Sequence, residues 1–354
     1  MQQKGSSFIL TQTWSCADAL SIITSIFQLL KTDTLRKIRS SMNKHWETAS
    51  YHQSVWAQRR IDILVGATPY GLDHMNRLEL SVCKVLNLVV TSDVHSTTMT
   101  DQLQILSNQT RNNVHNLTVC DIHDDVNTTI HTNLVEFVHK QKNLRQLTWL
   151  DCNDRKSLEQ QLAIHTFPKL QYFSYSHHTL SITSSLLQCK HLHTLKLSNG
   201  KYTFTEIRNI LTYLPTLYKV DFAWCRCQYD GCGYPTRTST IKQISFASLC
   251  SPLKEPIDII FKLLCIGDTV QELQLDNFNT DRHIEDATQL LKLPQLYLLT
   301  INVFANDFTK QQIHQLSTIF QSHSHLSKVL IKSDIVLWSR KEIVTTQMNI
   351  QTNI

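Results

Sequence analysis

The sequence predicts an α/β fold in which short parallel strands alternate with mostly helical return segments and stack into a solenoid. Three observations predict this fold. One apolar phrase recurs ten times between Val85 and Ile331, helical apolar spacing fills several intervals, and proline precedes three copies at a fixed distance. In each phrase a second apolar residue follows the first after three positions and a third follows two later, as in Leu192, Leu195 and Leu197.

The copies of the phrase follow one another at short, similar intervals. They begin at Val85, Val114, Leu144, Leu170, Leu192, Leu217, Ile241, Val270, Leu296 and Leu326. Successive starts are 29, 30, 26, 22, 25, 24, 29, 26 and 30 residues apart. Intervals of about 20 to 30 residues are typical of leucine-rich repeats. Because side chains alternate along a strand, the second and third apolar residues of each phrase should point into the core, and the residues between them outward.

The return segments carry apolar residues at helical spacing. They include residues 203–211, then Ile257, Ile260, Phe261 and Leu264, then Ile284, Ala287 and Leu291, and finally Ile313, Leu316 and Phe320. Pro168, Pro215 and Pro294 each lie two residues before a phrase, where a residue without an amide hydrogen ends a helix at little cost. Unrelated strands of an α/β domain would not explain this regular placement, so we expect stacked repeats with a mostly helical convex face.

A second pattern precedes the repeats, between residues 17 and 61. Two apolar helical stripes, separated by a possible helix cap at Thr32 or Asp33, predict three short helices. The first stripe holds Leu20, Ile23, Phe27 and Leu30, and the second holds Leu35, Ile38 and Met42. A bundle of about 45 residues is close to the lower size limit for an independent domain, so we expect it to lean on the first repeats or on a partner.

This segment resembles the F-box. The resemblance rests on the helix with Ile26 and Phe27, the Asp33 and Leu35 pair, Trp46 and a closing Trp56. The family usually opens with Leu-Pro and an acidic residue, whereas residues 16–20 here read Cys-Ala-Asp-Ala-Leu. Together with the repeats, the chain resembles an F-box and leucine-rich-repeat protein.

The resemblance implies a function without covalent chemistry. The F-box-like module would dock on the Skp-type adaptor of a cullin ubiquitin ligase, and the repeats would bind a protein substrate for ubiquitination. The adaptor-binding residues implied in this way are Leu20, Ile23, Phe27, Leu30, Leu35 and Trp46. The other interpretation of the same residues is a non-catalytic scaffold or inhibitor-like protein-binding module, whose N-terminal helices only cap the solenoid.

Four regions follow from these patterns. Residues 1–16 form an N-terminal tail, residues 17–61 the F-box-like module, residues 62–332 a solenoid of about ten repeats, and residues 333–354 a C-terminal cap or tail. The outward phrase positions of the middle repeats, with an aromatic residue just beyond one strand, are the candidate substrate-binding residues. They are Tyr172, Lys196, Lys219, Asp221, Trp224, Gln243 and Glu272. An ordinary solvated sheet surface would have the same polar composition.

Composition bears on the remaining function classes. The net charge is +5, but Lys and Arg are dispersed along the sequence, which argues against nucleic-acid binding. The sequence contains no apolar stretch of about 18 to 20 residues that could span a membrane, and its N-terminus does not resemble a secretory signal, so we expect a cytoplasmic or nuclear protein. It also lacks the common phosphate-loop, nucleophile-elbow and zinc-protease motifs, so we expect neither an enzyme nor a cofactor.

The ten cysteines raise the question of a metal site or disulfides. Cys225, Cys227 and Cys232 lie within eight residues, but zinc would need a fourth ligand, and their spacing is not that of a zinc finger. We therefore expect a loop with incidental cysteines and no metal. The scattered cysteines, such as Cys189 and Cys265, are expected to be free thiols that pack as small apolar residues.

Overall fold

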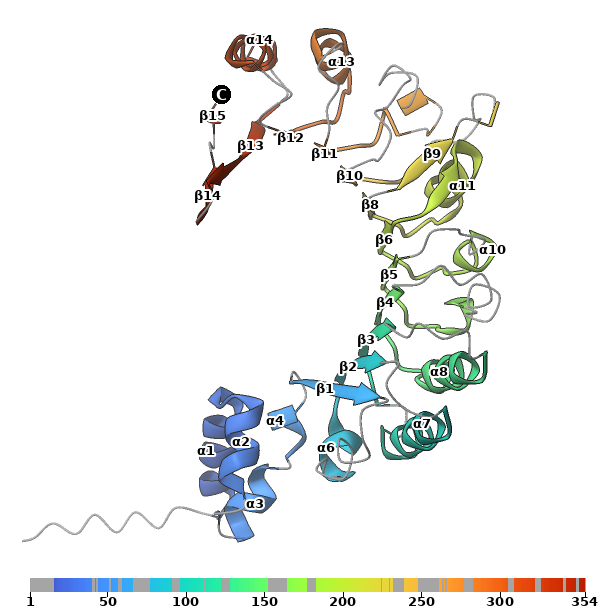
Figure 1. Ribbon diagram of the computed structural model, residues 1–354, viewed down its shortest axis with the longest axis vertical. Helices are drawn as coiled ribbons and strands as arrows, with labels where there is room; N and C mark the ends of the chain where they lie inside the picture. Colours follow the sequence, from blue (N-terminus) through green and yellow to red (C-terminus); the bar gives the residue numbers. More distant parts are fainter. Residues whose placement is uncertain are drawn as a thin grey trace, which may run out of the picture.

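The computed structural model forms an arc whose inner face is a continuous parallel sheet and whose outer face carries helices and turns (Figure 1). It describes residues 16–39, 42, 44–50, 52–56, 59–65, 77–90, 96–110, 113–121, 128–151, 164–176, 183–223, 225–228, 230–231, 239–247, 261–262, 264, 266–276, 283–304, 309–321, 326–339, 342–347 and 350–353. The predicted tail lies outside these residues, except Cys16.

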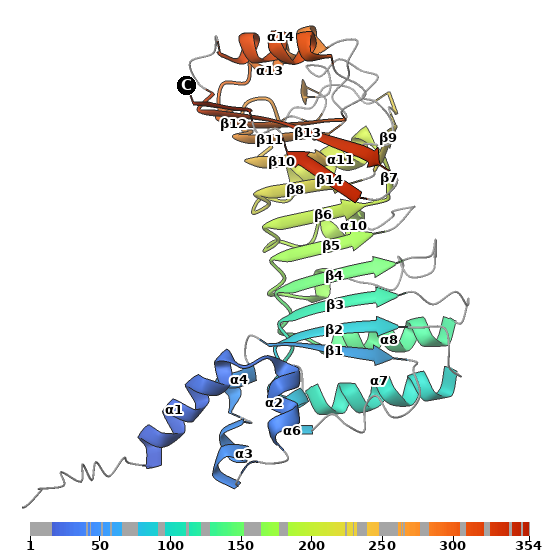
Figure 2. The same ribbon diagram turned by 60° about the vertical axis from the view of Figure 1, so that its left-hand side comes forward.

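One strand per repeat builds the inner sheet, and neighbouring strands in the stack are parallel (Figure 2). The strands are β1 (Arg60–Val65), β2 (Val85–Val90), β3 (Asn116–Asp121), β4 (Gln146–Asp151), β5 (Tyr172–Ser176), β6 (Thr194–Ser198), β8 (Lys219–Ala223), β10 (Gln243–Ala247), β11 (Glu272–Asp276), β12 (Leu298–Phe304) and β13 (Lys328–Ser339). Their register aligns the inward residues of successive phrases, so that Leu195 pairs with Val220 and Leu197 with Phe222. This alignment confirms the nine phrases from Val114 onward.

The first phrase was wrong by two residues, and one strand was missed. Strand β2 pairs Leu86 with Leu117 and Leu88 with Val119, so its phrase begins at Cys83 rather than at Val85. The thiol of Cys83 is buried, as an apolar residue at that position would be. Strand β1 escaped detection because position 58, where its phrase would begin, is glutamine. The sheet therefore starts inside the region that was assigned to the F-box-like module.

A four-residue turn leads into many of the strands. In each turn the amide of the first phrase residue donates to the carbonyl three positions earlier, as Leu170 does to Phe167 at 3.2 Å and Leu217 to Leu214 at 3.2 Å. Pro168 and Pro215 occupy the second turn position, where the proline ring already has the required φ. These prolines therefore shape the turn into the strand, in addition to following a helical segment.

The backbone also links consecutive repeats at the start of every strand from β3 onward along the inner sheet. The carbonyl of the second phrase residue accepts two amides from the next repeat, and His115 accepts from Arg145 at 2.7 Å and from Gln146 at 3.0 Å. The same pair of bonds recurs through Tyr297, whose carbonyl accepts from Ser327 and Lys328. Each strand is thus held to its neighbour before the regular ladder begins.

The outer face is built from short helices and turns. Its elements are α6 (Arg77–Val82), α7 (Ser96–Thr110), α8 (Thr128–Lys140), the 3₁₀ turn η1 (Ile164–Thr166), α10 (Thr183–Leu186), α11 (Phe204–Tyr213), α13 (His283–Leu290) and α14 (Lys310–Gln321). A capping box starts α11, because the Thr203 hydroxyl accepts from the Glu206 amide and the Glu206 carboxylate accepts from the Thr203 amide. The helices predicted at 203–211, 284–291 and 313–320 are confirmed, whereas Ile257 and Ile260 lie outside the described residues.

Among the described residues of the N-terminal module there are four helices, rather than the expected three: α1 (Cys16–Leu29), α2 (Thr32–Arg39), α3 (Lys44–Ser50) and α4 (Gln53–Trp56). The Trp56 ring is fully buried, its Nε1 donates to the Ser50 carbonyl at 2.7 Å, and the guanidinium groups of Arg39 and Arg59 lie 5.5 and 5.6 Å from the ring centroid. Arg59 also donates to the carbonyls of Val55 and Phe27. Because Arg59 directly precedes β1, these bonds join the module to the first strand.

The C-terminal end of the sheet is covered by strands. Strand β13 pairs in antiparallel fashion with β14 (Glu342–Gln347) and β15 (Ile350–Asn353). Strand β15 pairs with residues 328–331 of β13, and β14 pairs with residues 334–339, so β14 and β15 form the edge of the sheet at this end. The predicted region 333–354 thus contains strands laid along the last repeat.

A small second sheet of two strands lies beside the middle repeats. Strands β7 (Lys201–Thr203) and β9 (Arg226–Gln228) pair in parallel next to Gly200. A Cβ added at Gly200 would lie 2.3 Å from a ring carbon of the buried Tyr202. We expect Gly200→Ala to lower the free energy of unfolding by about 1–3 kcal/mol, because the ring must move. Urea denaturation measures this loss.

Gly267→Ala is the matched control for that measurement. Its added Cβ would meet only a Leu293 methyl group at 3.8 Å, which is ordinary contact. An equal loss of stability in both variants would show that the crowding at Tyr202 is not the cause.

Candidate functional site

The predicted substrate-binding residues lie on the inner sheet in two neighbouring rows. The register places Tyr172, Thr194, Lys219, Gln243 and Glu272 side by side across β5, β6, β8, β10 and β11. Lys196 and Asp221 lie together in the next outward row. The sheet therefore brings six of the seven predicted residues onto one surface, while Trp224 lies outside the described residues.

Several charges on this middle surface are paired with neighbours. The Lys196 ammonium lies 3.5 Å from the Asp221 carboxylate, and the Tyr297 hydroxyl donates to the Glu272 carboxylate at 2.5 Å. The hydrogen bond to Glu272 raises the pKa of Tyr297, because losing the proton would remove the bond. Lys219 is exposed. The middle surface is therefore polar and of mixed charge.

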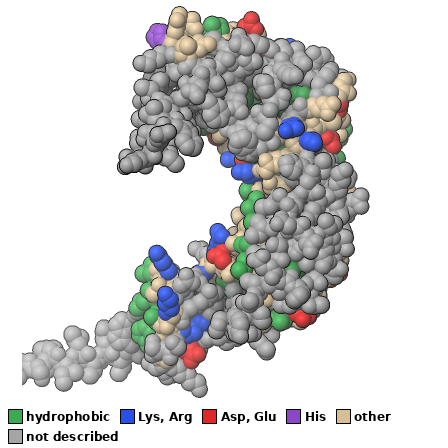
Figure 3. Space-filling view, viewed as in Figure 1, with side chains coloured by type: hydrophobic (Ala, Val, Ile, Leu, Met, Phe, Trp, Pro, Cys, Tyr) green, Lys and Arg blue, Asp and Glu red, His purple; other side chains and the backbone are tan. Residues whose placement is uncertain are grey.

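The first four strands carry an apolar row that the sequence reasoning missed. The register aligns Leu64, Val89, Cys120 and Leu150 at the outward position near the end of each strand. Leu64 is 45% exposed and Leu150 39% exposed. Hydrophobic side chains also reach the inner edge of the arc in the space-filling view (Figure 3). We call Leu64, Val89, Cys120 and Leu150 the apolar row. Its signal in the sequence was the presence of apolar residues at an outward position of the phrase.

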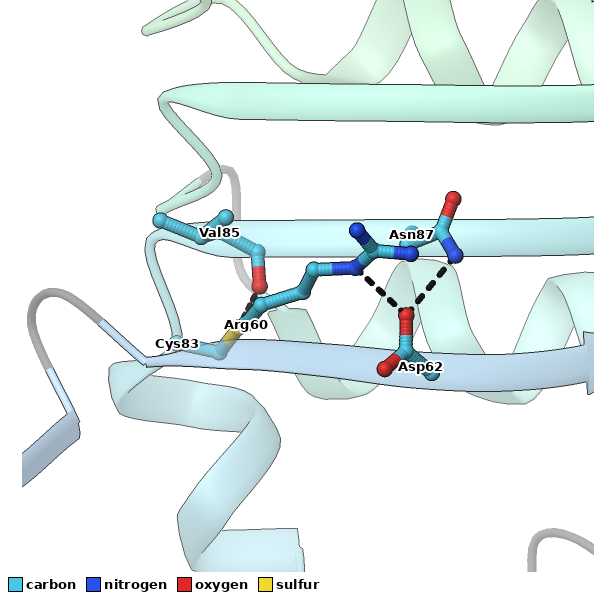
Figure 4. A network of polar contacts seen from close by, with 5 residues as sticks. All are labelled: Arg60, Asp62, Cys83, Val85 and Asn87. Carbon is cyan, nitrogen blue, oxygen red and sulfur yellow. Dashed lines mark hydrogen bonds and ion pairs between the residues drawn. The ribbon is translucent and has the colours of Figure 1, made fainter. Parts of the chain in front are cut away.

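A polar network borders this row between β1 and β2 (Figure 4). The Asp62 carboxylate accepts from the Arg60 guanidinium at 2.6 Å and from the Asn87 amide group at 2.7 Å. Arg60 and Asp62 are both exposed, so their pairing adds little stability, whereas the bond to the buried Asn87 fixes the position of Asp62. The start of the inner face is therefore ordered and close to neutral.

The predicted adaptor-binding residues divide into two groups. Phe27 is 1% exposed and Leu35 is fully buried, so both are core residues of the module and cannot contact an adaptor in this conformation. Ile23 and Leu30 are partly buried against the same core. Trp46 is 38% exposed and packs edge to face on Phe27, with ring centroids 5.8 Å apart. The side chain of Leu20 lies outside the described residues.

The opposite face of α1 carries the apolar side chains that solvent can reach. Ile26 is 42% exposed and Leu29 is 87% exposed, and both precede residues of the inner stripe in the sequence. Hydrophobic side chains gather on the side of the module that faces away from the arc (Figure 3). We call Ile26, Leu29 and Trp46 the exposed apolar residues of the module. The signal for Ile26 and Leu29 was a short helix with apolar residues on two faces, since one apolar face is enough for packing.

Three of the four cysteines whose side chains the structure describes, Cys83, Cys189 and Cys225, are buried, and Cys120 is half-buried. Cys83, Cys120, Cys189 and Cys225 form no disulfide within the described part of the chain. The thiol of Cys225 is buried and donates to the Leu197 carbonyl at 3.3 Å, and burial raises the pKa of Cys189 to about 12. The side chain of Cys227, and Cys232 and Cys265, lie outside the described residues. Among the side chains that are described, no three His, Cys, Asp or Glu come together as a metal site.

The register and the repeated phrase define the class of fold. Parallel strands, one per repeat, line the inner face, and helices or turns return the chain on the outer face, which is the architecture of a leucine-rich-repeat solenoid. No family model matches the chain, and no curated protein matches it. In the parts of the chain that are described, no helix has both the length and the apolar character needed to cross a membrane.

Among solved structures, the chain is similar to the crystal structure of an internalin (inlF) from Listeria monocytogenes. The two sequences are 13% identical, the match covers 85% of this chain and 93% of the internalin chain, and the TM-score is 0.38. The strand register of the chain itself defines the fold.

The burial of α1 and α2 predicts which substitutions in the module affect stability. We expect Leu35→Ala to lower the free energy of unfolding by about 2–5 kcal/mol and Phe27→Ala by about 3–5 kcal/mol, because both leave cavities. Leu29→Ala should stay within about 0.5 kcal/mol of the unchanged protein. Chemical denaturation of the full chain measures all three, and a large effect of Leu29→Ala would contradict its exposed position.

Proposed function

We propose that the chain is the substrate-recognition subunit of a Skp-cullin-F-box type ubiquitin ligase. The observation that carries the proposal is the 87% exposed Leu29 on a helix that already buries its other apolar face. An isolated solenoid cap has no need for Ile26, Leu29 and Trp46 at its surface, whereas large exposed apolar side chains commonly mark protein contacts. The exposed apolar residues of the module would contact the Skp-type adaptor, and the buried Phe27 and Leu35 would hold the helices that present them.

The solenoid would bind the protein substrate on its inner sheet. Two regions of that sheet support this role: the mixed polar surface formed by the six described candidate residues, and the apolar row on β1 to β4. An apolar centre with polar surroundings is typical of protein interfaces. Trp224, which follows β8 in the sequence, remains a proposed substrate contact.

The proposed mechanism is proximity. A substrate held on the inner sheet would present its lysines at high effective concentration to a conjugating enzyme that the adaptor and cullin bring to the same complex. This role requires a fixed relation between module and solenoid. The Arg59 bonds to Phe27 and Val55, directly before β1, support such a fixed relation. The chain itself would need no catalytic group or cofactor, and would act in the cytoplasm or nucleus.

A second candidate function is a scaffold or inhibitor-like binding protein with no ligase role. The observation that favours it is the continuous apolar core, which runs from Phe27 and Leu35 in the module into the first strands of the solenoid. Helices that share the core of the first repeat also serve as its cap. The two candidates differ in whether the surface of α1 binds an adaptor.

Co-purification of the full chain with a Skp-type adaptor tests the proposal. We expect the unchanged protein to retain the adaptor and the double variant Ile26→Asp, Leu29→Asp to lose it, because charged groups would enter an apolar interface. The matched control is Ile105→Asp, Ile284→Asp, which adds the same charges at two isoleucines on α7 and α13 that are each 43% exposed, close to the 42% of Ile26. Absence of retention by the unchanged, folded protein would favour the scaffold.

A further inference from the structure

The starts of the strands form one edge of the solenoid (Figure 2). In the first half of the arc the residues at this edge are basic. The segments that enter strands β2 to β6 are residues 83–85, 113–116, 141–146, 167–172 and 189–194, and they contain no Asp or Glu. They contain five Lys or Arg and three His. We call the five cations, Lys84, Lys142, Arg145, Lys169 and Lys190, the basic edge.

The backbone places Lys84, His115 and Arg145 at the starts of three successive strands, β2, β3 and β4. His115 donates its amide to the Lys84 carbonyl at 2.9 Å, and Arg145 donates to the His115 carbonyl at 2.7 Å, so each residue starts the strand beside the last. Strands in a sheet are about 4.8 Å apart, so the edge from β2 to β6 is about 19 Å long. Stacking therefore brings together residues from successive repeats, whose phrases start 22 to 31 positions apart between Cys83 and Leu192.

The basic edge is accessible and is not neutralised within the described part of the chain. Lys142, Arg145, Lys169 and Lys190 are exposed and Lys84 is half-buried. Lys169 donates to the neutral Asn143 side chain at 2.8 Å, and the described residues provide no ion pair for any of the five cations. Among the later entry segments, residues 266–272 before β11 include Asp268 and Glu272 and no Lys or Arg, whereas the segments before β8 and β10 carry one lysine each, Lys219 and Lys242. Positive charge is therefore concentrated beside the first half of the inner sheet.

We propose that the basic edge binds an acidic polypeptide segment of the partner that occupies the inner sheet. The inference rests on the proposed protein-binding role of the solenoid, but not on its role in a ubiquitin ligase. Charge complementarity identifies the occupant: a row of cations about 19 Å long matches about six residues of extended chain rich in Asp, Glu or phosphorylated side chains. The apolar row lies on β1 to β4, at the far ends of some of the same strands, so one partner could cover both.

His115 makes this interaction sensitive to pH. Partial burial lowers the pKa of His115, and the nearby Lys84, Arg145 and Lys169 lower it further. A carboxylate bound among these cations favours the charged imidazolium and raises that pKa. Binding therefore takes up a proton, and affinity should increase as the pH falls from 8 to 6, where glutamate is still ionised.

Fluorescence anisotropy with a labelled hexaglutamate peptide and the full-length protein tests the inference. We expect binding at low salt that weakens with added NaCl, and a loss of about tenfold in the triple variant Arg145→Gln, Lys169→Gln, Lys190→Gln. The matched control is Lys201→Gln, Lys292→Gln, Lys328→Gln, which removes the same charge at three exposed lysines elsewhere and should change affinity less than twofold. No binding, or equal weakening in both variants, overturns the inference.

Two further measurements distinguish a peptide ligand from a nucleic acid and isolate the role of His115. A labelled hexathymidylate that binds more tightly than hexaglutamate, and loses affinity in the same triple variant, would assign the edge to nucleic acid and overturn the proposal. In His115→Gln the increase in affinity between pH 8 and pH 6 should be smaller, and an unchanged increase would overturn the role of His115. No adaptor is present in these measurements, so their outcome is independent of adaptor co-purification.

Discussion

The alignment of inward side chains from strand to strand is the constraint on which the rest of the structure depends. Each repeat is too small to bury its own apolar residues, so Leu195 and Leu197 are covered only because Phe173 and Tyr175 lie on one side and Val220 and Phe222 on the other. Side chains alternate faces along a strand, so a slip of one residue would expose this whole set. The register that buries the core also determines which residues share a row on the inner face.

The sequence was sufficient for the repeats wherever all three apolar positions of the phrase are occupied by apolar residues. It was insufficient where the first position is Gln58 or Cys83, because neither matches an apolar template, although the buried Cys83 packs as an apolar residue would. The repeat that begins at Cys83 still makes the backbone bonds of the later repeats, because the Lys84 carbonyl accepts from the His115 and Asn116 amides without any contribution from side chains. A search for the apolar phrase therefore detects the later repeats of the solenoid more reliably than its first two.

The candidate sites were harder to predict for a different physical reason. On α1 the sequence shows apolar residues on two faces, and only the packing of α3 and α4 decides that Phe27 lies inside and Leu29 outside. The Lys and Arg residues are dispersed in the sequence, which argued against nucleic-acid binding. Stacking brings residues one repeat apart to neighbouring strands, so a dispersed pattern became a continuous edge. Exposed surfaces of a solenoid are thus determined by the period of the repeat as much as by local composition.

The distribution of surface chemistry divides the solenoid into two halves. In the first half, the basic edge and the apolar row lie at opposite ends of the strands, separated by five residues or about 16 Å. From β6 onward, Lys196 pairs with Asp221 and Glu272 with Tyr297, which satisfies those charges internally. A partner gains more from neutralising unpaired cations and covering exposed leucines than from replacing bonds that already exist. The first half is also the end that carries the exposed face of α1, so the surfaces with the most to gain from a partner are concentrated at one end of the arc.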